Sequence, residues 1–404
     1  MSVENNFKQT EIGLIPEDWE VVKLGDVVEV KAGQSAPQGE KYFQNGKYPF
    51  IRVQHIDNSD YKIIGWDLIN DIAVKDYCLK LFPKDTIVFP KSGATVYLEK
   101  RAMLPFNAYI VSHLCAINSK SENLLQKFLF YFFVNQKLAN KKAEGYPTLN
   151  LSEIKGMLIP LPPLEEQRKI AKVLDKIQQA IEVQDKIIQQ VKNLKKSLMQ
   201  KLFTEGLYGE EQKETEIGLI PKSWEVVRLG EVFNIFAGGD ISKLNWSPEK
   251  NDKFIYPIYS NSLENDGLYG FADTFKFQNA ITVTGRGNVG YAVPRYEKFN
   301  AIIRLLVLVP KVTLNIKFVA EFINKFIKVN FEGSSIPQLT RPKIATFLTP
   351  LPPLEEQNQI AHILSTIDKK IEVEQKRKEI LKELFKTMLH KLMSGEIRLK
   401  DVEI

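Results

Sequence analysis

Residues 10–30 read TEIGLIPEDWEVVKLGDVVEV, and residues 215–235 read TEIGLIPKSWEVVRLGEVFNI. A second motif, LPPLEEQ, occurs at residues 161–167 and again at residues 351–357. Repeats separated by about 200 residues are much longer than the units of a solenoid, so they predict a duplicated domain with pseudo-two-fold symmetry. In each copy the shared motifs bracket a variable block of largely unrelated sequence. This layout is expected when one scaffold carries two different surfaces.

The composition is that of a folded protein with two or three domains. Of its 404 residues, 44% are hydrophobic and 26% are charged, and the net charge is +6. Residues 31–157 contain 17 Lys and Arg against 11 Asp and Glu, and residues 236–347 contain 14 against 9. Two positive variable blocks favour two separate contacts with a nucleic acid. A lysine-rich solvated surface would give the same counts, so charge alone leaves both interpretations open.

The cellular compartment is indicated by what the sequence lacks. Cys78 and Cys115 are its only cysteines, which suits a reducing compartment and excludes a disulfide scaffold or a cysteine zinc cluster. The first residues, MSVENNFKQT, do not resemble a signal peptide, and no run of 18 apolar residues occurs. We therefore expect a cytoplasmic protein with no membrane span.

Each copy starts with a leading segment, and its variable block has an α+β pattern. The leading segments predict a short strand that ends in a turn at Gly25 and Gly230, with Trp19 and Trp224 as core anchors. The fold of the two blocks is expected to be shared, because short landmarks such as Tyr-Pro recur in both. Strands are expected at 86–89, 280–284 and 302–309, and helices at 122–139 and 317–329.

A long helix is predicted after each LPPLEEQ motif. The Pro-Pro pair suits a first helical turn, and the glutamates that follow it favour the positive end of the helix dipole. Apolar residues then recur with heptad spacing, interrupted at Gln184 in the first helix and at Glu374 and Lys378 in the second. The apolar positions are 170, 174, 177, 181, 188, 191, 194 and 198, and then 360, 364, 367, 371, 381, 385, 388 and 392.

Connectivity predicts how the two helices pair. Each has about 38 residues and is therefore roughly 55 Å long, and neither can bury its apolar seam alone. The link at 204–214 is short, so the second helix must run back along the first. We expect an antiparallel coiled coil with one globular domain at each end. The predicted division is 1–157, 158–206, 207–347 and 348–404.

No catalytic or metal-binding motif is found. Residues 285–290 spell GxGxxG, but Pro294 follows closely and opposes the helix that a dinucleotide site needs. A glycine-rich loop that offers Arg286 and Asn288 to DNA is the better interpretation. A P-loop motif is absent, and the four histidines do not have metal-ligand spacing. The residue patterns therefore give no support for a catalytic site.

The two TEIGLIPxxWEVVxLG segments and the two LPPLEEQ motifs with their heptad helices resemble the specificity subunit of a Type I restriction–modification system. The resemblance covers essentially the whole chain. It implies that each variable block is a target recognition domain for one half of a split DNA sequence. It also implies that the helices are spacers that bind two methyltransferase subunits, which bring S-adenosylmethionine and methylate adenine N6. Two restriction subunits, which use ATP and Mg, can join the complex.

Candidate site residues follow from these patterns. Polar side chains that suit base edges in the major groove occur in both blocks, and basic side chains occur on the outer helix faces. The DNA-binding candidates are Arg52, Gln54, His55, Lys91, Ser92, Thr148, Asn261, Ser262, Arg286, Asn288, Gln338 and Arg341, and the partner-binding candidates are Arg168, Lys172, Lys186, Lys376 and Arg377. Two other hypotheses stay open here, namely a coiled-coil scaffold that binds only protein and an enzyme with an unrecognised site.

Overall fold

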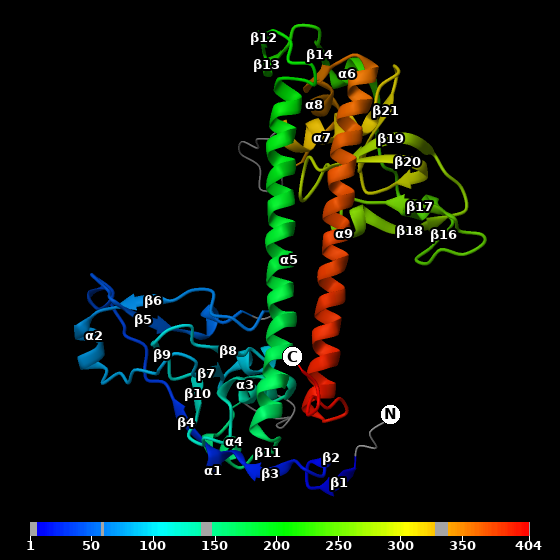
Figure 1. The fold of residues 1–404 in the computed structure, drawn as a ribbon. Coiled ribbons are helices and arrows are strands. Elements are labelled where there is room, and N and C mark those ends of the chain that lie inside the picture. Colours follow the sequence, from blue (N-terminus) through cyan, green and yellow to red (C-terminus); the bar gives the residue numbers. More distant parts are fainter. Residues whose placement is uncertain (1–5, 58–59, 139–147, 328–337, 404) are drawn as a thin grey trace. The chain divides into compact units, whose positions relative to one another are not determined.

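The computed structural model describes residues 6–57, 60–138, 148–327 and 338–403. The chain divides into two compact units (Figure 1). Unit 1 consists of residues 1–184 and 377–404, and unit 2 consists of residues 185–376. Each unit contains one leading segment, one variable block and part of each long helix. Each unit therefore contains residues from both copies of the repeat.

The leading segments have the same structure in both units. In unit 1, β1 (Phe7–Thr10) and β2 (Gly13–Pro16) form a hairpin, and β3 (Glu20–Lys23) pairs with β11 (Leu158–Leu161). In unit 2, β12 (Gln212–Thr215) and β13 (Gly218–Pro221) form the hairpin, and β14 (Glu225–Arg228) pairs with β22 (Leu348–Leu351). Both strand pairs join the start of a copy to the residues just before its long helix.

The expected turn at each leading-segment glycine is instead one turn of helix. These turns are α1 (Leu24–Val27) and α6 (Leu229–Val232). A Cβ atom at Gly25 would lie 3.0 Å from the Cβ of Lys155, and one at Gly230 would lie 3.0 Å from the Cβ of Ala345. The prediction of a turn was therefore wrong, because glycine here permits close packing against a second short helix. Those short helices are α4 (Leu151–Lys155) and α8 (Arg341–Ala345).

The variable block of unit 1 contains two small sheets. A four-stranded sheet has the order β4-β10-β7-β8, and a three-stranded sheet has the order β6-β5-β9. The elements are β4 (Val28–Ala32), β5 (Tyr48–Ile51), β6 (Asp67–Ile69), α2 (Asp71–Asp76), β7 (Ile87–Pro90), β8 (Ala102–Met103), β9 (Tyr109–Ile110), β10 (Leu114–Ser119) and α3 (Gln126–Asn135). The predicted strand at 86–89 corresponds to β7, and the predicted helix at 122–139 corresponds to the shorter α3.

The variable block of unit 2 has one sheet of seven strands, in the order β15-β21-β19-β20-β17-β18-β16. Its first four strands repeat the arrangement of β4-β10-β7-β8, and a parallel pair (β17 with β20) repeats the parallel pairing of β5 with β9. The shared fold is thus confirmed. The elements are β15 (Phe233–Ala237), β16 (Trp246–Ser247), β17 (Tyr256–Tyr259), β18 (Leu268–Ala272), β19 (Phe277–Val283), β20 (Ala292–Ala301), β21 (Leu306–Pro310) and α7 (Ile316–Phe326).

One predicted strand in unit 2 begins too early. The apolar run at 302–309 forms β21 only from Leu306 onward. Ile303 and Arg304 have φ of +53° and +59°, and the amide of Leu305 donates to the carbonyl of Ile302, so these residues form a turn. A positive φ at a β-branched residue is unusual and gives no hydropathy signal. The predicted strand at 280–284 corresponds to β19, and the predicted helix at 317–329 corresponds to α7.

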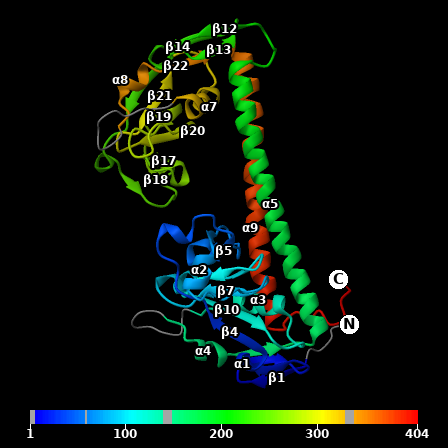
Figure 2. The ribbon, with the colours of Figure 1, turned by 90° about the vertical axis from the view of Figure 1, so that its left-hand side faces the viewer.

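The long helices are α5 (Leu164–Thr204) and α9 (Leu354–Met393). In unit 1 the start of α5 shares a core with the end of α9, through Ile170 and Leu392 among others. In unit 2 the end of α5 shares a core with the start of α9, through Leu202 and Leu364 among others. Within each unit the two segments therefore run antiparallel, as predicted (Figure 2).

Burial along the helices confirms most of the heptad pattern. Two of the three predicted polar interruptions, Gln184 and Glu374, are buried, and the third, Lys378, is half-buried. Leu194 is 53% exposed, however, so its assignment to the seam was wrong. An α-helix drifts relative to a strict seven-residue repeat, and the inward face here passes through Lys195 and Met199 instead.

Each unit contains a buried carboxylate that connects segments distant in the sequence. The indole N–H of Trp19 donates to Glu166 at 3.0 Å, and that of Trp224 donates to Glu356 at 2.8 Å. Both tryptophans are fully buried, which confirms them as core anchors. Glu166 also accepts from the backbone amide of Leu399 at 3.2 Å, and Glu356 accepts from that of Leu207 at 2.8 Å. The second glutamate of each LPPLEEQ motif thus ties a tryptophan to the segment that follows a long helix.

Candidate nucleic-acid interface

The same pair of segments meets in both units. In unit 1, Ser92 and Thr148 form an antiparallel bridge, and the amide of Leu149 donates to the carbonyl of Lys91 at 2.7 Å. In unit 2, Arg286 and Gln338 form the corresponding bridge, and the amide of Leu339 donates to the carbonyl of Gly285 at 2.9 Å. The structure therefore brings together candidates that lie far apart in sequence. The backbone geometry is shared, whereas the side chains differ.

In unit 2 the glycine-rich stretch is a tight connection between β19 and β20. Thr284 Oγ1 donates to the carbonyl of Asn288 and accepts from the amide of Tyr291 at 2.9 Å. Gly287 and Gly290 have φ of +70° and +93°, a region that favours glycine. Because a strand follows this turn, no helix N-terminus is available for a pyrophosphate, as the sequence indicated. Arg286 and Asn288 are both exposed at the turn.

Asn261 holds this turn in place. Its side-chain amide donates to the carbonyl of Ile303 at 2.6 Å and accepts from the amide of Gly285 at 2.7 Å. Both ends of the Asn261 amide are therefore engaged inside unit 2, and this contact fixes the position from which Arg286 projects. The neighbouring Ser262 is exposed, and its hydroxyl accepts from the amide of Glu264 at 3.1 Å.

In unit 1, Arg52 and His55 form a local cluster after β5. Arg52 Nε lies 2.5 Å from a carboxylate oxygen of Asp67, and the amide of Arg52 donates to His55 Nδ1 at 3.0 Å. Burial lowers the pKa of His55 below its ordinary value of 6.5, although the charge of Asp67 opposes this effect. Neutral His55 therefore positions the loop, while Gln54 beside it is exposed.

The remaining DNA-binding candidates lie around the two bridges. Ser92 Oγ is 2.7 Å from His113 Nδ1, and Lys91 is half-buried. In unit 2, Gln338 and Arg341 are exposed, with Arg341 at the start of α8. His113 was not among the candidates, because its sequence position gives no sign that it lies beside Ser92. Which of these side chains contact bases stays a prediction.

Comparison with known proteins identifies the family. Residues 16–193 and 221–383 match the model of the Type I restriction modification DNA specificity domain, so the two matches together span both copies.

The chain belongs to this specificity family.

It is 30% identical to a protein of Methanocaldococcus jannaschii assigned as the type I restriction enzyme MjaX specificity subunit, over 98% of each chain. It is 27% identical to the MjaVIII specificity subunit of the same organism, over 99% of this chain and 97% of the relative. The Type I system S subunit of M. genitalium has the same fold, with a TM-score of 0.60 over 97% of this chain and 98% of that one at 18% identity.

This specificity subunit therefore carries two recognition domains for a DNA target. The family membership excludes the hypothesis of a scaffold that binds only protein. Among the described residues, no group of three or more His, Cys, Asp and Glu side chains could hold a metal ion. Over the same residues, no helix is long and apolar enough to cross a membrane.

The helices of the specificity subunit expose apolar as well as basic side chains. Arg168 and Lys376 are exposed and pair with acidic neighbours on their own helices, Glu165 at 3.3 Å and Glu372 at 2.7 Å. The other basic candidates, Lys172, Lys186 and Arg377, are also exposed. The sequence pattern missed the exposed large apolar side chains on the same helices, which include Val183, Leu194, Val373, Ile380 and Leu384. Such residues suit the buried centre of a protein interface.

Proposed function

We propose that each unit of this specificity subunit reads one half of a split DNA target. The observation that carries this proposal is the repeated bridge, Ser92 with Thr148 in unit 1 and Arg286 with Gln338 in unit 2. A shared backbone geometry with different side chains is what two domains need if they bind DNA in the same way but read different bases. Both variable blocks are positive, which supplies the attraction to phosphate that any such contact requires.

Polar side chains at the bridges contact base edges; those of unit 2 are exposed, and Ser92 and Thr148 of unit 1 are half-buried. Arg286 suits the O6 and N7 acceptors of guanine, and Asn288 or Gln338 suits adenine, in the major groove. Asn261 and His55 act as positioning residues, because their polar atoms are engaged within their own units. Phosphate contacts hold the duplex, whereas these few base contacts give the sequence preference.

The chemistry belongs to partner subunits in the cytoplasm. Two methyltransferase subunits dock on the outer faces of α5 and α9, where exposed apolar side chains lie among basic ones. S-adenosylmethionine is bound by those methyltransferases, and ATP and Mg are bound by restriction subunits that join them. This chain itself binds no cofactor and catalyses no step. The purified chain is accordingly expected to transfer no methyl group to DNA when S-adenosylmethionine is added alone.

Exchanging one variable block tests whether each unit reads a different half of the target. Residues 31–157 are replaced by the corresponding block of another specificity subunit, and the methylated motif is determined in a host that also expresses the methyltransferase. One half of the motif should change while the other half stays the same. The reciprocal exchange of residues 236–347 is the matched control and should change only the other half. A change in both halves after a single exchange would contradict the proposal.

A further inference from the structure

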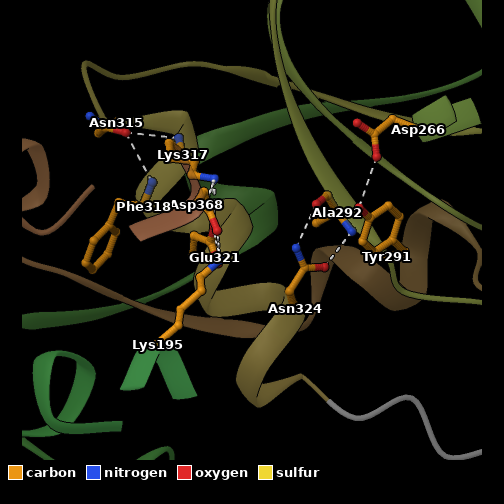
Figure 3. A network of polar contacts seen from close by, with 10 residues as sticks. All are labelled: Lys195, Asp266, Tyr291, Ala292, Asn315, Lys317, Phe318, Glu321, Asn324 and Asp368. Atoms are coloured by element: carbon orange, nitrogen blue, oxygen red, sulfur yellow. Dashed lines mark hydrogen bonds and ion pairs between the residues drawn. The ribbon is translucent and has the colours of Figure 1, made fainter. Parts of the chain in front are cut away.

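Unit 2 contains a cavity of about 1000 Å³ beside the Arg286 turn. Its walls come from the β19–β20 connection, α7 and the unit 2 segments of α5 and α9. The floor is a network of four charged side chains (Figure 3). Lys195 lies 3.1 Å from Glu321 and 2.7 Å from Asp368, and Lys317 lies 2.7 and 2.8 Å from the same two carboxylates. Two cations and two anions balance, so the floor is neutral.

Outside this network, the cavity lining carries three lysines, Lys192, Lys196 and Lys325, against one carboxylate, Asp266. Lys192 and Lys196 of α5 line the rim of the cavity, and both are exposed. Neither lysine has an ion-pair partner within the described part of the chain. They lie four residues apart on one helix face, where like charges repel. Among the described residues no carboxylate neutralises this pair, so both ammonium groups are available to an external anion.

Unit 1 has a smaller cavity, of about 570 Å³, at the equivalent place. Lys382 and Lys386 of α9 line it, at the same positions in the second repeat as Lys192 and Lys196 in the first, since both pairs share the 190-residue offset of the two LPPLEEQ motifs. Lys386 is exposed, and Lys382 lies 3.9 Å from Asp60. Each unit thus carries a lysine pair at the mouth of its own cavity.

The interiors of the two cavities have diverged. The position of Lys195 in unit 2 is occupied by Phe385 in unit 1, where its ring lies 6.1 Å from the rings of Tyr61 and Tyr131. An aromatic contact in unit 1 therefore takes the place of one cation of the unit 2 network. The lysine pair at the rim is present in both units although the residues beneath it differ in kind. The pair is thus independent of what packs inside the cavity.

We propose that the lysine pairs Lys192/Lys196 and Lys382/Lys386 bind the phosphate backbone of the DNA duplex. This inference rests on the proposed function and extends it, because it makes the long helices part of the DNA interface. Asn288 lines the same unit 2 cavity as Lys192 and Lys196, so a duplex that meets the turn with its base edges brings phosphates to the rim. Lysine is a point charge and holds phosphate without reading sequence.

The test uses the full chain in complex with its methyltransferase partner. It compares variants in which neutral glutamine replaces the lysines of each pair. The variants are Lys192→Gln/Lys196→Gln and Lys382→Gln/Lys386→Gln. The control is Lys176→Gln/Lys369→Gln, two exposed lysines of the same helices that line neither cavity. Affinity is measured across a series of salt concentrations, for a duplex that carries the methylated motif and for a duplex of random sequence.

Each rim variant should reduce the slope of log affinity against log salt by about 2, since each phosphate contact contributes about 0.9. Affinity for the two duplexes should fall by the same factor, while the control keeps the wild-type slope. Lys192→Arg/Lys196→Arg, which keeps both charges, should also keep the slope.

Unchanged slopes in both rim variants, with a wild-type preference for the motif intact, would overturn this inference alone. Loss of the methyltransferase from a rim variant with an unchanged DNA slope would assign the lysines to the protein partner and also overturn it. A wild-type chain that does not distinguish the motif from random sequence would instead overturn the proposed function.

Discussion

At the scale of single residues, the same contact occurs once in each unit: a buried glutamate accepts a hydrogen bond from a buried tryptophan. A buried tryptophan needs an acceptor for its indole N–H, and the second glutamate of each LPPLEEQ motif provides it. In unit 1, Arg398 also donates to Glu166, at 2.9 and 2.8 Å. Burial alone would raise the pKa of Glu166, but the hydrogen bonds from Arg398 and Trp19 outweigh it and hold the pKa below the ordinary 4.5.

Glu166→Gln is expected to lower the free energy of unfolding of unit 1 by about 2 kcal/mol, because Arg398 loses its buried acceptor. A lowered pKa stabilises the folded state above the unfolded value, and this stability is lost as the pH falls below about 4.5. The variant should therefore lose part of the wild-type acid sensitivity. Denaturant unfolding at a series of pH values measures both effects.

Glu165→Gln is the control for this substitution, since the Glu165 side chain is 67% exposed and precedes Glu166 in the same helical turn. It should change stability by less than about 0.5 kcal/mol. If Glu165→Gln and Glu166→Gln had equal effects, the helix dipole and not the buried contact would explain the glutamate pair.

Arg286 is the residue expected to carry most sequence information in unit 2. Arg286→Ala should relax the preference at one base pair of one half-site, at a cost of about 1–3 kcal/mol, and leave the other half-site unchanged. Arg228→Ala removes an exposed arginine from β14 and should leave the preference intact. Binding to a set of single-base variants of the motif measures the difference. A uniform loss across all base pairs would make Arg286 a phosphate contact.

At the scale of elements, the repeats predicted most of the architecture. The positions of β7, β19, α3 and α7 and the antiparallel helices all follow from hydropathy and connectivity. The bridges that bring Ser92 to Thr148 and Arg286 to Gln338 could not be predicted, because they join distant segments through backbone contacts. Sequence patterns report local periodicity, whereas these two bridges depend on which distant segments the tertiary fold places side by side.

Which residues of the long helices face inward could also not be predicted fully from the sequence. Leu194 fits the heptad pattern, yet it is exposed and the charged Lys195 beside it faces inward. Lys195 is paired with carboxylates from α7 and α9, and only the fold reveals these partners. A polar side chain is favourable in a partly buried position when its charge is fully paired, which a pattern of apolar residues does not detect.

The ionic floor of unit 2 is expected to couple α7 to the long helices. Lys195→Ala should lower the free energy of unfolding of unit 2 by about 2 kcal/mol, because Glu321 is left buried with one fewer cation. Lys196→Ala removes the next lysine, which is exposed, and should cost less than about 0.5 kcal/mol. Hydrogen exchange of the α7 amides compares the two variants. Equal protection in both would show that the network does not stabilise this element.

At the scale of the whole molecule, duplication explains why the chain carries two recognition domains. Both units have the same leading segment, the same strand order at the centre of the variable block and the same bridge. They differ in the side chains at that bridge and in the floor of the cavity beside it. A split target follows from this pattern, with each half read by a different set of side chains. The placement of the two domains at opposite ends of the helices stays a prediction.

The most direct test is methylation-sensitive sequencing of a host that expresses this chain with its methyltransferase, compared with a host that expresses the methyltransferase alone. The account predicts a split motif with N6-methyladenine in both halves, present only when this chain is expressed. The same methylated motif in both hosts, or a continuous motif without a gap, would contradict it.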